Sequence, residues 1–320
     1  MAIVPNLRST LLGLVTISAL AGGAVASLDI SLRAQSASIA PLVGARDSSG
    51  DSDRHNSPSA ASDDHDQSSP EKDNPPAASA PENRHELRLG LNTDAFTYTT
   101  VANAESVALT SKWSQRLSTY LSETPFQRFG EAGAQTNALL TFRFTPHVWV
   151  TGGGGFANRQ DVVAREQADI ELGIARRLNN RFVKGTEFYL QQRDYWFTSS
   201  KVSAFGITDL FYLPRDWSFT LSSTAARTIL PGFEPAWTPS AFAKVSFPIA
   251  SRLGGSLTYG FGAENFAAAD QIGRISAHSF GCGLRVRLNR NQDITWSFAL
   301  QDRSQGQKQY NNGVSYGYRF

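Results

Sequence analysis

The chain has 320 residues, and its 30 Lys and Arg against 28 Asp and Glu leave a formal net charge of +2. Its single cysteine, Cys282, excludes an internal disulfide. Because that cysteine lies far from the amino terminus, a lipoprotein anchor is excluded as well.

The amino-terminal residues have the pattern of a secretory signal peptide. Arg8 precedes the apolar, small-residue stretch LLGLVTISALAGGAVA at 11–26, which ends in the cleavage pattern Ala24-Val25-Ala26. A transmembrane anchor is disfavoured, since the stretch is short and no basic flank follows it. We therefore predict a signal peptide at 1–26 and export, which makes nucleic acid an unexpected partner.

The next segment, 27–84, is predicted to be a disordered periplasmic tail. Residues 45–84 are mostly Ser, Asp, Pro and Ala, and acidic residues outnumber basic ones. Such a segment buries too little apolar surface to offset the entropy of ordering. The remaining residues, 85–320, are mildly basic, which suggests an anionic ligand or the membrane surface.

Residues 85–320 alternate between apolar and small or polar side chains in stretches of about ten residues. Ile170, Leu172 and Ile174 alternate with polar and small residues, as does the segment 294–301. Short links at 113–116, 145–147, 178–181, 213–216, 248–252 and 289–293 alternate with longer polar ones, among them QRFGEAG (127–133) and WFTSSK (196–201).

This pattern predicts an all-β, antiparallel up-and-down transmembrane barrel of fourteen strands over 85–320, in the cell outer membrane and monomeric. Lipid offers no partners to backbone groups, so the sheet has to close. The segment 201–213 breaks strict alternation, which leaves a bulge or a count of twelve open. A soluble β-sandwich is the alternative architecture. Trp113, Trp149, Trp217 and Trp296 lie near short links, as an interfacial belt requires.

The final strand alternates strictly and ends on an aromatic residue. We interpret it as the closing, lipid-facing strand, carrying a signal read by the barrel assembly machinery of the outer membrane. The residues of this predicted assembly signal are Val314, Tyr316, Tyr318 and Phe320.

Several segments resemble the YaiO-type family of outer-membrane β-barrel proteins. They are RFGEAG (128–133), FGAENFAAADQIGRISAHSFGCGLRVRL (261–288), DITWSFALQDRSQGQ (293–307) and VSYGYRF (314–320). The resemblance covers roughly 86–320 and implies an outer-membrane barrel, without transferring catalytic residues. Some members carry helical repeats before the barrel and look like exopolysaccharide exporters; here the predicted tail stands in that place.

A channel is the first functional hypothesis, because fourteen strands enclose a lumen that side chains do not fill. We expect a basic lower lumen that favours saccharide-like or anionic solutes, with Tyr189 and Phe242 stacking on sugar rings. The alternative for each arginine is a structural ion pair within the wall. The predicted lumen and selectivity residues are Arg143, Asp169, Glu171, Arg177, Glu187, Tyr189, Arg193, Arg285, Arg287 and Arg319.

Two other functions stay open. One is a structural or assembly barrel without transport, with the tail as a plug or a protein-binding segment. The other is a lipid-face hydrolase built from Ser276, His278 and Asp302. We expect no enzymatic activity, no cofactor and no metal site; the expected partners are outer-membrane lipid, the assembly machinery and a polysaccharide or small anionic solute.

Overall fold

The computed structural model describes residues 84–98, 100–128, 130–158, 163–178, 180–229, 231–232, 234–264, 275–303 and 306–320. The predicted signal peptide and, apart from Arg84, the predicted tail lie outside the described residues. Within the part of the chain that is described, no helix has the length and apolar character needed to cross a membrane.

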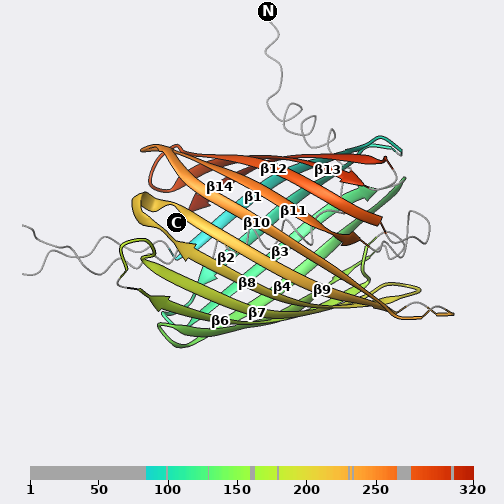
Figure 1. Cartoon of the computed structure of the whole chain (residues 1–320), viewed down its shortest axis with the longest axis horizontal. Helices are drawn as coiled ribbons and strands as arrows, with labels where there is room; N and C mark the ends of the chain where they lie inside the picture. The colour runs from blue at the N-terminus through green and yellow to red at the C-terminus, as the bar shows by residue number, and fades with distance from the viewer. Residues whose placement is uncertain are drawn as a thin grey trace, which may run out of the picture. The chain divides into compact units, whose positions relative to one another are not determined.

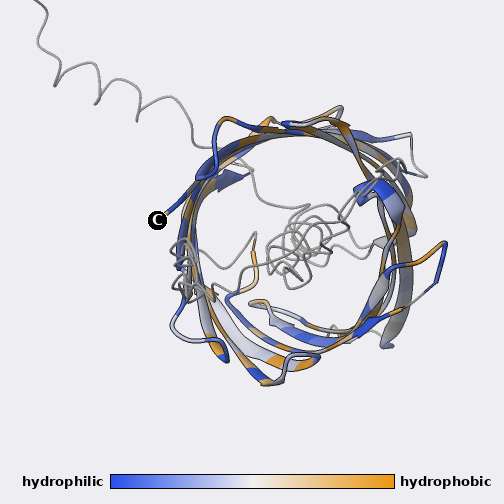
Figure 2. Ribbon diagram, turned by 90° about the vertical axis from the view of Figure 1, so that its left-hand side faces the viewer, coloured by the Kyte–Doolittle hydropathy of each residue, from blue (hydrophilic) through white to orange (hydrophobic). Residues whose placement is uncertain are grey.

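Fourteen antiparallel strands form one closed barrel, in which each strand pairs with its neighbours in sequence and β1 pairs with β14 (Figures 1 and 2). The first seven are β1 (His85–Phe96), β2 (Ala102–Lys112), β3 (Leu117–Arg128), β4 (Glu131–Thr145), β5 (Val148–Ala157), β6 (Glu166–Arg177) and β7 (Gly185–Trp196). The others are β8 (Lys201–Tyr212), β9 (Ser218–Ile229), β10 (Ala236–Ala250), β11 (Leu253–Glu264), β12 (Ile275–Arg287), β13 (Gln292–Arg303) and β14 (Lys308–Arg319).

The predicted fold class and the count of fourteen strands are confirmed. Strand β8 pairs without interruption with β7 and β9, so the irregular alternation at 201–213 produces neither a bulge nor a twelve-strand barrel. The register shifts lie elsewhere, between Arg143 and Thr145 in β4 and between Pro248 and Ala250 in β10. Both are at strand ends next to a tight link, where an extra residue is easily accommodated.

We call the end of the barrel at which β1 begins and β14 ends the Phe320 rim, and the other end the opposite rim (Figure 1). The links at the Phe320 rim are 113–116, 146–147, 178–184, 213–217, 251–252 and 288–291, close to the predicted short turns. Three links at the opposite rim, 129–130, 197–200 and 304–307, are equally short, so the prediction of longer loops was wrong at these three places. Gly130, at φ +86°, supplies the left-handed residue that the two-residue link requires.

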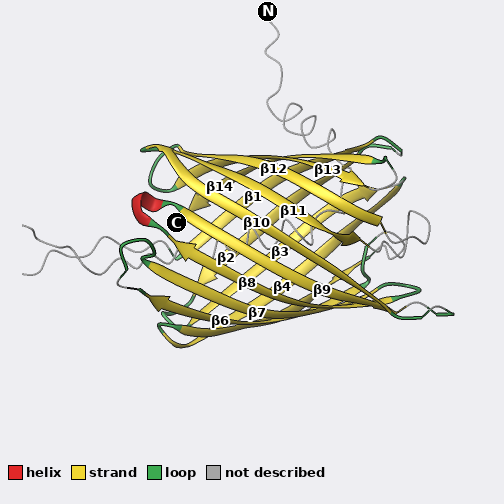
Figure 3. Cartoon of the chain, viewed as in Figure 1, coloured by secondary structure: helices red, strands yellow, loops and turns green. Residues whose placement is uncertain are grey.

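The link between β8 and β9 contains a short 3-10 turn, η1 (Pro214–Asp216), the helical segment drawn in red in Figure 3. Arg215 and Asp216 both have φ near +60°, and the Trp217 N–H donates to the Pro214 carbonyl at 3.5 Å. Two successive left-handed residues are the geometry of a type I′ turn, which matches the twist of a β-hairpin.

The closing seam joins β1 to β14 from Glu86 opposite Arg319 to Phe96 opposite Gln309. At its end the His85 N–H donates to the Phe320 carbonyl at 3.0 Å, and the Phe320 N–H donates to the His85 carbonyl at 2.9 Å. Phe320 is therefore hydrogen-bonded to the sheet, and β14 closes the barrel, as the closing-strand interpretation predicted.

Candidate functional site

The register separates the lumen face of every strand from its outward face. On β14, buried Gln309, Asn311 and Gly317 face the lumen, while Tyr310 and Val314 between them are exposed. The same alternation, carried across paired strands, identifies the lumen-facing residues around the barrel. It places on that face Arg143, Asp169, Glu171, Arg177, Glu187, Tyr189, Arg193, Arg285, Arg287 and Arg319.

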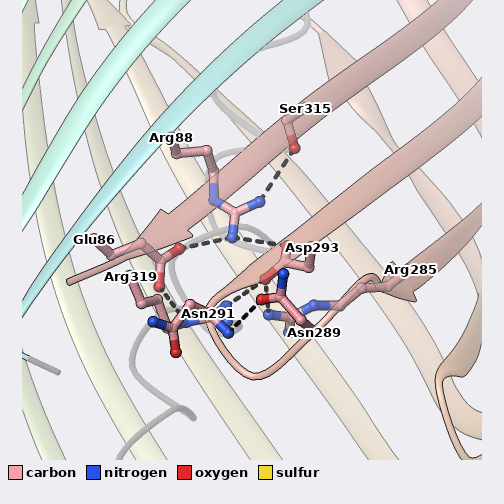
Figure 4. A network of polar contacts seen from close by, with 8 residues as sticks. All are labelled: Glu86, Arg88, Arg285, Asn289, Asn291, Asp293, Ser315 and Arg319. Carbon is pink, nitrogen blue, oxygen red and sulfur yellow. Dashed lines mark hydrogen bonds and ion pairs between the residues drawn. The ribbon is translucent and has the colours of Figure 1, made fainter. Parts of the chain in front are cut away.

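The centre of one lumen wall, near the Phe320 rim, is Asp293, whose side chain is 0% exposed (Figure 4). Its carboxylate accepts hydrogen bonds from Arg285 at 2.8 Å, from Arg88 at 3.3 Å and from Arg319. Glu86 accepts from Arg88 at 2.7 Å and from Arg319 at 3.0 Å. We call these five residues the seam network, since they join β1 to β14, β13 and β12.

The seam network brings together two predicted lumen residues, Arg285 and Arg319, and gives them carboxylate partners from the wall. The sequence interpretation missed these partners, because Asp293 was assigned to a turn and Glu86 lies at the very start of β1. The sequence did hold a signal for these carboxylates, because it placed two arginines, Arg285 and Arg319, near the same rim. Clustered guanidinium groups are stabilised by nearby carboxylates. With three arginines against two carboxylates, the network keeps an excess of positive charge.

The other predicted arginines differ in their surroundings. Arg193 on β7 pairs with Asp169 on β6 at 3.0 Å, and both side chains are about nine-tenths buried. Glu171 lies opposite Gln191 in the same strand pair. Arg177 and Arg287 are exposed near the Phe320 rim, and neither forms an ion pair with a residue that the structure describes.

An aromatic cluster forms the facing part of the lumen wall, on β5 to β8. Trp149 and Tyr189 are 4% and 5% exposed, pack with Leu210, and meet edge to face with ring centroids 5.7 Å apart. Tyr189 donates its hydroxyl to Glu187, which also accepts from the Tyr212 hydroxyl at 3.0 Å. Tyr189 therefore packs within the wall and presents little free ring surface to a sugar.

The prediction that Trp149 belongs to an interfacial belt was wrong. Its ring lies inside the barrel over Gly173, whose position on β6 is directly opposite, and the Arg143 guanidinium stacks on it at 5.0 Å. A Cβ atom on Gly173 would overlap the indole. The glycine thus makes the space that turns Trp149 inward, and this pairing across strands was not visible in the local sequence.

The lumen wall near the opposite rim is held by amide and carboxylate groups. Asp94 on β1 accepts hydrogen bonds from Gln309 and Asn311 on β14, each at 2.9 Å. Arg303 donates to Gln309 at 3.0 Å and to the Tyr98 hydroxyl. These residues connect β1, β13 and β14, so polar contacts secure the seam at both ends of the lumen.

His278 and Asp302 of the hydrolase alternative lie on the outward face near the opposite rim. His278 is directly opposite Asp302 in the β12–β13 register, and Ser276 precedes it on β12. The Nδ1 atom of His278 shares a 2.9 Å hydrogen bond with the Tyr259 hydroxyl, and the two rings stack. The hydrogen bond described for the His278 imidazole is therefore with the Tyr259 hydroxyl on β11 and not with Asp302.

The outward face of the barrel is apolar around its circumference. Exposed side chains on it include Leu91, Leu121, Ile170, Ile207 and Leu257. An apolar surface that encircles a closed sheet is far larger than soluble monomers expose, and it is what lipid requires.

Aromatic residues gather on this outward face near the Phe320 rim. Ring pairs form between Phe142 and Phe144, Phe211 and Phe219, Trp217 and Phe247, and Tyr318 and Phe320. Trp113 and Trp217 are exposed there, as the belt prediction required. Such a girdle marks the level of a membrane–water interface.

Solved structures include outer-membrane proteins to which this chain is similar. A bacterial polysaccharide outer membrane secretin superposes with a TM-score of 0.50 and 10% identity, over 74% of this chain and 99% of that one. OpdQ of Pseudomonas aeruginosa gives 0.46 and 10%, over 74% and 97%. An anion-selective porin from Comamonas acidovorans gives 0.41 and 8%, over 74% and 98%.

At these identities the likeness concerns the fold alone. No protein-family model matches the chain, and no curated protein matches it either. The closed fourteen-strand sheet, the apolar outward face and the aromatic girdle together lead to one conclusion. The chain is an outer-membrane β-barrel.

Proposed function

We propose that this barrel is a channel that passes small anionic solutes. The observation that supports it best is the charge of the lumen face towards the Phe320 rim. There the arginines Arg88, Arg143, Arg177, Arg285, Arg287 and Arg319 outnumber the carboxylates Glu86, Glu187 and Asp293. A surplus of fixed positive charge in a pore raises the local concentration of anions and lowers that of cations.

The test is single-channel conductance of the refolded full-length chain in a planar bilayer under a KCl gradient. We expect stable conductance and a reversal potential that reports preference for chloride. A second form of the protein, from which residues 27–84 are deleted, tests whether the tail is a plug. If it is, the barrel conducts only in this shortened form. A barrel that is folded, as shown by its heat-dependent shift on gels, but silent in both forms would contradict the channel and favour a structural or assembly role.

Saccharide-like solutes are the second part of the proposal, and they have weaker support. Tyr189 is packed into the wall, which leaves Phe242, half-buried on the lumen face of β10, as the predicted ring for sugar stacking. The YaiO-type resemblance and a link to exopolysaccharide export belong to this part, and they rest on the motifs given above. Block of the KCl current by an added oligosaccharide tests it.

We also propose that the final strand carries the signal for the outer-membrane assembly machinery. Val314, Tyr316 and Tyr318 lie on the outward face, and the Phe320 ring stacks on Tyr318 at 5.7 Å. The proposal assigns no enzymatic reaction to the barrel. The absence of an enzymatic role would be contradicted if the purified protein hydrolysed a chromogenic ester or a phospholipid and lost this activity on His278→Ala.

A further inference from the structure

The lumen wall formed by β8 to β11 is rich in hydroxyl groups and poor in charge among the side chains that the structure describes. Among the lumen-facing side chains that the structure describes on these four strands, Lys244 is the only ionised one. Its lumen-facing neighbours on β9, β10 and β11 include Thr220, Ser222, Ser246 and Thr258. The wall therefore differs from the paired arginines and carboxylates of the seam network.

Lys244 is only 8% exposed, yet its ammonium forms no ion pair or hydrogen bond with any residue that the structure describes. Thr220 and Thr258 lie directly opposite it on β9 and β11, so their side chains flank the lysine on both sides. Their hydroxyls also have no hydrogen-bond partner among the described residues, and Thr220 is 7% exposed. Lys244 carries its charge on a largely buried side chain, and an anion entering from the lumen would offset the cost of that charge.

Among the side chains that the structure describes on the surrounding strands, no carboxylate lies opposite or next to that ammonium. Along the register in one direction, Lys244 is followed by Thr258, Gly281, Ala299 and Asn311 on β11 to β14. In the other direction, Thr220 and Leu210 separate it from Glu187 on β7. Glu187 is three strands away and already accepts hydrogen bonds from two tyrosines. With no described carboxylate beside Lys244, a solute in the lumen is the counter-charge that we consider.

We infer that Lys244, Thr220 and Thr258 form a binding site for a small oxyanion at mid-height of the lumen. Lys244 is in the middle of β10 (Ala236–Ala250), well away from both rims. A lysine ammonium is a compact charge with three donors, and hydroxyls beside it add two more, a donor set that suits phosphate, sulfate or carboxylate oxygens. The inference rests on the proposed function in that the solute has to enter the lumen.

The decisive test is equilibrium dialysis of radiolabelled inorganic phosphate against the folded full-length chain in detergent. We expect saturable binding that is at least about tenfold weaker in Lys244→Gln, the loss typical of one charge-assisted hydrogen bond. Lys201→Gln is the matched control, because Lys201 lies on the outward face and pairs with Asp194 at 3.2 Å. It should bind phosphate like the wild type.

A second variant, Thr220→Val with Thr258→Val, keeps the lysine and the side-chain shapes and should also weaken binding. Glucose 6-phosphate is expected to displace the labelled phosphate, and glucose is not. Absence of phosphate binding in the wild type, equal binding in Lys244→Gln, or displacement by glucose would overturn the site.

Dialysis needs no current, so the site and the channel can fail separately. A barrel that binds phosphate through Lys244 but is silent in the bilayer refutes the channel and keeps the site. An anion-preferring channel whose phosphate binding is unchanged by Lys244→Gln refutes the site and keeps the channel.

Discussion

Glu86 on β1 and Arg319 on β14 are paired across the seam at which the barrel closes, with the Arg319 Nε atom donating to Glu86 Oε2 at 3.0 Å. The two residues are 233 positions apart in the sequence. Their contact exists only when the sheet is closed, and Asp293 connects it to β13. The seam network is thus a property of the complete barrel.

Asp293→Asn should destabilise the barrel, since three arginines would then share the single carboxylate of Glu86. We expect a loss of about 2 kcal/mol, below the roughly 3–5 kcal/mol of a fully buried pair because the arginines are partly exposed. Urea unfolding of the refolded protein, followed by tryptophan fluorescence, measures it. Asp302→Asn on the outward face is the control, and equal stability of the two variants would argue against a role of the network in closure.

Gly173→Ala should displace the Trp149 ring from its place in the lumen wall. A Cβ atom there overlaps the indole, and overpacking of this kind costs roughly 1–3 kcal/mol. Near-ultraviolet circular dichroism and urea unfolding report the change. Gly254→Ala, also on the lumen face, is the matched control, because its Cβ atom would approach other atoms no closer than 3.7 Å. Indistinguishable spectra for the two variants would show that Trp149 does not depend on this glycine.

Arg177→Gln combined with Arg287→Gln should reduce the preference of the channel for anions. Both guanidinium groups are exposed, so screening limits the effect to about 0.4 kcal/mol, or roughly twofold in the anion-to-cation permeability ratio. The reversal potential in a KCl gradient is the readout. The charge-balanced double variant Arg193→Gln with Asp169→Asn should leave the ratio near the wild-type value. If the permeability ratio changes more in this control than in the Arg177 and Arg287 variant, anion selectivity depends on Arg193 instead.

Asp216→Gly should stabilise the barrel, because it removes a left-handed non-glycine residue from the η1 link. Relief of the left-handed strain should raise the free energy of unfolding by about 1 kcal/mol. Part of this gain is offset, because glycine increases the conformational entropy of the unfolded chain. The midpoint of urea unfolding should rise without a change in slope. Asp209→Gly, in the extended strand β8, is expected to lower it, and a fall in both variants would mean that the turn tolerates aspartate without strain.

Deletion of Phe320 should reduce the amount of barrel in the outer membrane several-fold while lowering the stability of the purified barrel by no more than about 2 kcal/mol. The residue contributes two backbone hydrogen bonds to the seam, worth roughly 1–2 kcal/mol together. Membrane fractionation and urea unfolding provide the two measurements. Phe144→Ala removes an exposed aromatic side chain from the same rim and should leave the amount unchanged. An equal yield of the two variants would oppose the assembly-signal proposal.

Much of the fold could be predicted from the sequence, because each strand of a membrane barrel carries the alternation within itself. Ile170 to Ile174 and Ile294 to Leu300 show their outward faces without knowledge of any partner strand. The tightness of the links was less predictable. The link at 129–130 depends on Gly130 in a two-residue turn, and its polar flanks, which suggested a longer loop, continue the strands.

The candidate site was less predictable, because its contacts depend on which strands are neighbours. Trp149 turns inward since Gly173 lies opposite it on another strand, a fact that the spacing of tryptophans from turns does not contain. The sequence interpretation assigned Asp293 to a turn, and only the register places it between Arg285 and Arg319. The lumen positions themselves followed from alternation, whereas their partners followed from topology.

The seam network also makes the charge balance of the lumen depend on translation through β13 and β14. Glu86 and Arg88 are synthesised well before Asp293 and Arg319, since 205 positions separate Arg88 from Asp293. A product truncated before Asp293 would hold Arg88 and Arg285 without the carboxylate that joins them, and its first strand would lack Arg319 as a partner. The complete set of ion pairs thereby distinguishes a chain that contains β13 and β14 from one interrupted before them.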